Sequence, residues 1–67
     1  MKFSARNKIP GTVSEVKPGA VMAIVKVKIG ENIVESAITK EAVEDLDLKA
    51  GDKVTVVIKS TSVMIMK

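Results

Sequence analysis

Residues 20–29 read Ala-Val-Met-Ala-Ile-Val-Lys-Val-Lys-Ile, and this stretch decides the fold class. In its second half, valine and isoleucine alternate with Lys26 and Lys28, which is typical of a β-strand with one apolar face and one charged face. In its first half, both faces around Met22 and Ile24 are apolar. We therefore expect this part of the strand to be buried on both faces or to contact another subunit.

Turn sequences divide the rest of the chain into further pieces of strand length. Proline, glycine and polar residues recur between segments that are rich in β-branched residues. Eleven valines, seven isoleucines and four threonines, against two leucines, favour strands. In the first segment Val13 and Val16 are out of phase, which predicts a β-bulge. The expected strands are 12–17, 20–29, 33–39, 53–59 and 62–66.

Residues 39–46 depart from this pattern. Thr39 is an N-cap candidate, acidic residues follow it, and Val43 and Leu46 are spaced as on one helix face, which predicts a helix of about two turns. Three strands, a short helix and two more strands predict an all-β fold, a five-stranded, partly open barrel of the oligonucleotide/oligosaccharide-binding (OB) type. No repeat or linker divides the chain, so we expect residues 1–67 to form one domain.

The composition excludes several kinds of site. The 67 residues include no cysteine and no histidine, so disulfides, zinc fingers, iron–sulfur clusters and the commonest general base are excluded. Because there is also no phosphate-loop pattern, we expect no enzyme activity. A chain this short buries only about 60% of its unfolded surface, so self-association is the expected source of stability. No signal peptide or membrane span is apparent, which favours the cytoplasm and argues against a membrane partner.

The net charge of +3 is compatible with nucleic acid, an anionic membrane surface or a small anion. Barrels that bind single strands usually stack bases on aromatic side chains, and here the only aromatic residue, Phe3, precedes the first turn. Most lysines alternate with core residues, as on solvated strand faces. A nucleic-acid-binding module is therefore the less favoured alternative, and a purely structural oligomerisation module is another.

Two segments differ from ordinary surface. They are Ser4-Ala5-Arg6-Asn7 and Lys59-Ser60-Thr61-Ser62. Together they supply a guanidinium, an ammonium, several hydroxyls and backbone N–H groups, all donors suited to a small tetrahedral dianion, and neither contains an acidic residue. On composition alone, a solvated turn and a frayed terminus remain the favoured interpretation.

The same segments closely resemble the molbindins, small molybdate-binding proteins of the molybdenum-pterin-binding protein (Mop) family. Each is built from one transport-associated OB-like (TOBE) module. The resemblance covers essentially the whole chain and is strongest in 4–7, 11–13, 19–21 and 58–65. It implies a cytoplasmic protein that stores or buffers molybdate or tungstate, with no organic cofactor and no directly ligated metal. It also implies a strand-exchanged homo-oligomer, a hexamer arranged as three dimers.

By position, the resemblance implies that the oxyanion lies at a subunit interface, between the first segment of one chain and the lysine-serine turn of another. The residues in contact with it would be Ser4, Ala5, Arg6, Lys59 and Ser60, with Asn7, Thr61 and Ser62 as further candidates. A second kind of site, near a three-fold axis, would be formed around Gly19, Ala20 and Val21.

Overall fold

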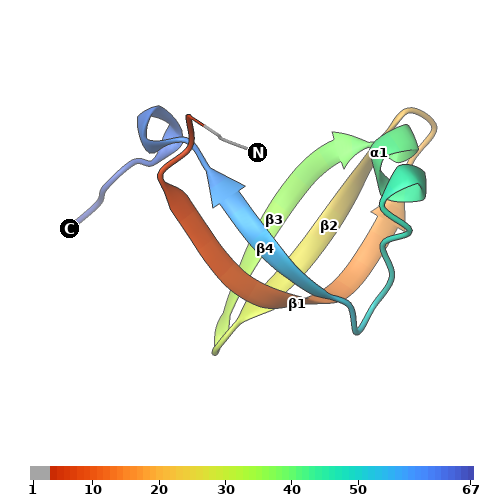
Figure 1. Cartoon of the computed structure of the whole chain (residues 1–67), viewed down its shortest axis with the longest axis horizontal. Coiled ribbons are helices and arrows are strands. Elements are labelled where there is room, and N and C mark those ends of the chain that lie inside the picture. Colours follow the sequence, from red (N-terminus) through yellow and green to blue (C-terminus); the bar gives the residue numbers. More distant parts are fainter. Residues whose placement is uncertain (1–3) are drawn as a thin grey trace.

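The computed structural model describes residues 4–67. The elements are β1 (Asn7–Pro18), β2 (Met22–Ile29), β3 (Asn32–Thr39), α1 (Lys40–Asp45), β4 (Lys53–Ile58) and the 3₁₀ turn η1 (Ser60–Ser62). They form one antiparallel sheet in the order β3-β2-β1-β4, which curls without closing (Figure 1). The all-β, partly open architecture with one short helix is therefore confirmed.

The central strand β1 is long and strongly bent (Figure 1). Its first half pairs with β4 and its second half with β2, and Thr12 lies opposite a residue of each. The register shifts between Val13 and Glu15, which confirms the predicted bulge. The strand begins at Asn7, earlier than predicted, because Pro10 and its neighbouring glycine are accommodated within the pairing with β4.

The core lies on the concave side of the sheet and is small. Val13, Val25 and Val27 are its buried residues, and the half-buried Val43 and Leu48 pack against them. Val43 comes from α1, which Thr39 caps by accepting a hydrogen bond from the N–H of Ala42 at 3.0 Å. The predicted helix and its N-cap are thus confirmed. No helix among residues 4–67 is long and apolar enough to span a membrane.

The predicted fifth strand, over residues 62–66, does not form in the single chain. The 3₁₀ turn η1 begins one residue after β4 and sends the C-terminal residues away from the sheet, where they find no strand edge to pair with (Figure 1). Met64, Ile65 and Met66 are 92%, 89% and 94% exposed. Met22, expected to be buried on both faces or in contact with another subunit, is 47% exposed in the isolated chain.

Candidate oxyanion-binding site

The start of β1 lies against the end of β4. Asn7 is opposite Ile58 in the antiparallel pair, and its Nδ2 donates a hydrogen bond to the Ile58 carbonyl oxygen at 3.2 Å. Because the strands run in opposite directions, the residues before β1 and those after β4 emerge at the same end of the sheet (Figure 1). The two segments singled out in the sequence, 4–7 and 59–62, therefore meet at this junction within one chain, whereas the resemblance implied that they meet between two chains.

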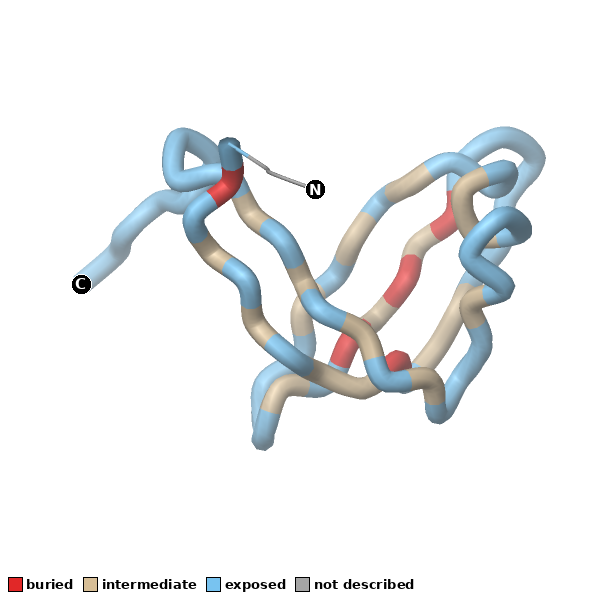
Figure 2. The backbone as a smooth tube through the Cα atoms, viewed as in Figure 1, coloured by how far each residue is buried: buried red, intermediate tan, exposed pale blue. Residues whose placement is uncertain are grey.

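The N-terminal segment 4–7 has one buried residue, Ala5. Ala5 is only 7% exposed, while Ser4 and Arg6 on either side of it are exposed (Figure 2). Ala5 is therefore buried between two exposed polar residues. The sequence thus places a hydroxyl and a guanidinium at the surface of the junction.

The second segment forms a compact turn. Lys59 precedes η1 in an extended conformation, and its carbonyl oxygen accepts a hydrogen bond from the N–H of Ser62 at 2.9 Å. The Ser60 carbonyl oxygen accepts one from the N–H of Val63 at 3.3 Å. Ser60, Thr61 and Ser62 are all exposed. The turn therefore presents three consecutive hydroxyl-bearing residues that directly follow Lys59 in the chain.

The charged groups of the junction are uncompensated. Neither Arg6 nor Lys59 forms an ion pair with another residue of the described range 4–67. In the same range, the side chains of Ser4, Ser60, Thr61 and Ser62 form no hydrogen bond. These donors are therefore available to an external acceptor.

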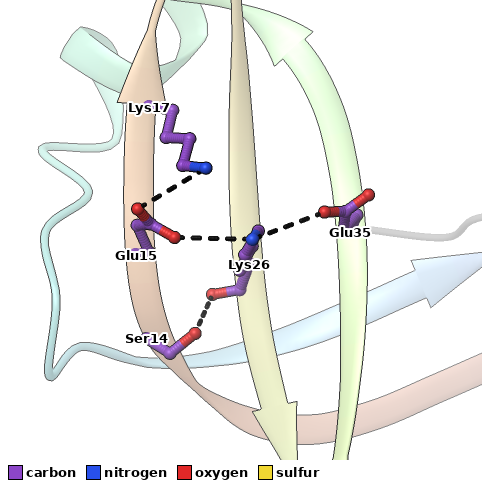
Figure 3. Close-up of polar contacts among 5 residues, drawn as sticks. All are labelled: Ser14, Glu15, Lys17, Lys26 and Glu35. Atoms are coloured by element: carbon purple, nitrogen blue, oxygen red, sulfur yellow. Dashed lines mark hydrogen bonds and ion pairs between the residues drawn. The ribbon is translucent and has the colours of Figure 1, made fainter.

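Lys26, on the outer face of the sheet, differs from Arg6 and Lys59 because it is ion-paired. Its ammonium lies 3.5 Å from a Glu15 carboxylate oxygen and 3.7 Å from one of Glu35, and Glu15 also pairs with Lys17 at 3.8 Å (Figure 3). Ser14 Oγ donates to the Lys26 carbonyl oxygen at 3.2 Å. The positive charge of Lys26 is thus neutralised within the sheet. An anion would gain far less from Lys26 than from Arg6.

The chemistry available at the junction is anion binding. Guanidinium, ammonium and hydroxyl groups can hold a tetrahedral oxyanion through charge-assisted hydrogen bonds. No cluster of acidic, histidine or cysteine side chains that could hold a metal ion occurs within residues 4–67. The two segments of the junction, 4–7 and 59–62, offer hydrogen-bond donors and contain no acidic side chain.

The third segment, Gly19-Ala20-Val21, lies at the other end of the sheet, between β1 and β2 (Figure 1). The Gly19 N–H donates to the Met22 carbonyl oxygen, and the Val21 carbonyl oxygen accepts from the N–H of Lys40, each at 2.8 Å. Ala20, Val21 and Lys40 line a hollow of about 520 Å³ that also contains two glutamates. Within one chain, this loop does not join the junction. The nearby Lys40 was not among the predicted residues, because only the folded chain brings it to the loop.

Comparison with models of known protein families shows the family of this chain. The TOBE domain matches residues 4–65, which include both segments of the junction. The chain belongs to the TOBE domain family. The resemblance noted from the sequence is thereby confirmed.

This TOBE domain is similar over its full length to characterised relatives. It is 48% identical over 67 residues to molybdenum-pterin-binding protein 3 of Clostridium pasteurianum, covering 98% of each chain. A molybdate-binding protein from Sporomusa ovata superposes with a TM-score of 0.95 at 43% identity, covering 100% of both chains. The cytoplasmic molybdate-binding protein ModG, solved with molybdate bound, matches with a TM-score of 0.84 at 43% identity. That match covers 90% of this domain and 43% of ModG.

Proposed function

We propose that this TOBE domain binds molybdate and acts as a store or buffer for it, without catalysing a reaction and without an organic cofactor. The observation that carries the proposal is the junction of Asn7 with Ile58, which brings two acid-free donor segments together. Similarity over at least 90% of this chain to proteins described as binding molybdate or molybdenum-pterin supports the choice of ligand.

In the proposed mechanism, the donors of the junction replace the water shell of the dianion. Burying an anion requires both charge neutralisation and hydrogen bonds. Arg6 supplies a planar fork for two oxygens, Lys59 a point charge and Ser60 a hydroxyl. Ser4 and the backbone at Ala5 complete the contacts, with Asn7, Thr61 and Ser62 in support. Tungstate has the same charge and shape, so we expect it to bind as well.

We further propose that the site is completed between subunits. The junction is exposed in a single chain, and the apolar residues 64–66 that follow η1 have nothing to cover them there. A second chain that pairs with this tail would bury apolar surface and exclude water from the neighbouring donors. The proposed assembly is a strand-exchanged hexamer of three dimers in the cytoplasm, with a second oxyanion site at Gly19, Ala20 and Val21.

Thermal melts of the whole protein against molybdate, tungstate, sulfate and phosphate test the proposal. A ligand that binds only the folded state adds about 2.7 kcal/mol at 100 times its Kd. We expect molybdate and tungstate to raise Tm by several degrees, and sulfate and phosphate to raise it less. No shift with any oxyanion would favour a structural oligomerisation module. Tight binding in a gel-shift assay at physiological salt would instead favour a nucleic-acid-binding module.

A further inference from the structure

A row of three side chains crosses the outer face of the sheet where β1 bends. Thr12 of β1 lies opposite Lys28 of β2 on one side and opposite Lys53 of β4 on the other. Directly opposed residues of antiparallel strands share a face. The three residues, called the Thr12 row, therefore present a hydroxyl between two ammonium groups.

The Thr12 row carries positive charge that the fold leaves uncompensated. One step along the same face, Lys26 is held between two glutamates (Figure 3). Lys28 and Lys53, by contrast, form no ion pair with any residue in the described range 4–67. Asp52, next to Lys53 in the chain, is occupied by Lys49, whose N–H donates to it at 3.0 Å and whose ammonium lies 3.7 Å away.

The row also borders a hollow. An open depression of about 590 Å³ is lined by all three of its members, by Pro10 and by the hydroxyl-bearing Thr55, which lies opposite Pro10. Within residues 4–67, no acidic residue lines this depression. It therefore combines two cations, two hydroxyls and space for a small molecule.

We infer that the Thr12 row binds a diphosphate group. The two lysines stand on either side of β1, so their Cα atoms are separated by two strand spacings, about 9.5 Å. Two cations spread in this way match two linked phosphates better than one tetrahedral ion, and the flexible lysine stems can close on them. Thr12 lies five residues along β1 from Asn7, roughly 16 Å away, so this site is separate from the oxyanion junction and independent of it.

Titration calorimetry of the whole protein with inorganic pyrophosphate at about 0.15 M salt, where diffuse surface attraction is screened, tests the inference. We expect the double variant K28Q/K53Q to bind at least tenfold more weakly than the unmodified protein. The variant K17Q/K67Q removes the same charge from two exposed lysines outside the depression and leaves Asp52 held by Lys49, and we expect less than a twofold change. Thr12→Val, which removes one neutral donor, should weaken binding by about two- to tenfold.

Two further measurements separate this site from the junction. K28Q/K53Q should retain its molybdate-induced rise in Tm, and Arg6→Ala should retain pyrophosphate binding. Titration with a nucleoside diphosphate is compared with titration with pyrophosphate. Equal affinity for the two would show that the row recognises the diphosphate group alone, and a higher affinity for the nucleoside diphosphate would show that it recognises a nucleotide. Absence of pyrophosphate binding by the unmodified protein would overturn the inference. Equal losses in the two double variants, or loss of binding in Arg6→Ala, would also overturn it.

Discussion

Arg6 is the residue on which the proposed oxyanion site depends most. Arg6 is exposed and unpaired within the described chain, at the junction where the start of β1 pairs with the end of β4. Replacing Arg6 by alanine should cost about 1.5–3 kcal/mol of molybdate binding, which is a ten- to hundredfold loss of affinity. Ser60→Ala should cost less, about 0.5–1.5 kcal/mol. Titration calorimetry with molybdate ranks these variants.

Lys26→Ala is the matched control, because this lysine is already neutralised by Glu15 and Glu35. We expect it to leave the molybdate affinity almost unchanged. A loss as large as that of Arg6→Ala would mean that binding is diffuse electrostatic attraction. The oligomeric state of each variant is measured first, so that loss of assembly is not mistaken for loss of a ligand contact.

Gly11 allows β1 to pass close to β2. A Cβ atom at this position would lie 2.6 Å from Val27 Cγ1 and 2.9 Å from the Lys28 carbonyl oxygen. Because the second contact is with backbone, Gly11→Ala should destabilise the fold by about 1–3 kcal/mol through overpacking. Urea denaturation measures the loss. An unchanged midpoint would show that the bend of β1 relaxes without cost.

At the residue scale, the types of residue in the site stand out in the sequence, whereas the meeting of the two segments was implied only by the family resemblance, and as a contact between chains. Arg6, Lys59 and the adjacent hydroxyls stand out in the sequence because they are donors in segments without acidic residues. That they meet follows from the pairing of Asn7 with Ile58, a contact between residues far apart in the chain. No local pattern encodes such a contact. The proximity of Lys40 to Val21 was missed for the same reason.

At the scale of elements, the contribution of the Thr39 N-cap to the stability of α1 can be measured. Thr39 is exposed, and its hydroxyl accepts a hydrogen bond from the Ala42 N–H. Thr39→Ala should therefore lower the free energy of unfolding by about 1 kcal/mol, the usual cost of losing an N-cap. Circular dichroism melts measure the effect, with Thr61→Ala as the control, since Thr61 is exposed and makes no hydrogen bond within residues 4–67. Equal losses of stability in Thr39→Ala and Thr61→Ala would exclude loss of the N-cap hydrogen bond as the cause.

Elements set by local rules were predicted, and those that need a partner were not. The bulge in β1 follows from the phase of its valines, and the start of α1 follows from the chemistry of Thr39. Residues 62–66 have strand-forming composition, but composition does not provide an edge to pair with. Within one chain they consequently extend from η1 without joining the sheet.

At the scale of the whole molecule, the exposed tail predicts assembly. The single chain leaves Met64, Ile65 and Met66 almost fully exposed, and its own buried core consists of only a few valines. Sedimentation equilibrium at micromolar concentration should therefore show a closed oligomer, the hexamer of the proposed function. Removal of residues 63–67 should dissociate it and abolish molybdate binding with it. A single 7 kDa species for the intact chain would contradict both the assembly and the shared site.

We propose that molybdate is held where the segment before β1 meets the turn after β4. Crystals grown with molybdate, measured at the molybdenum absorption edge, locate the metal directly in an anomalous difference map. We predict a molybdenum peak at this junction. The oxygens of the bound molybdate should lie within about 3 Å of the Arg6 guanidinium and the Ser60 hydroxyl, the distance of a hydrogen bond. A molybdenum peak elsewhere, with none at these residues, would show that the oxyanion site does not lie at the junction.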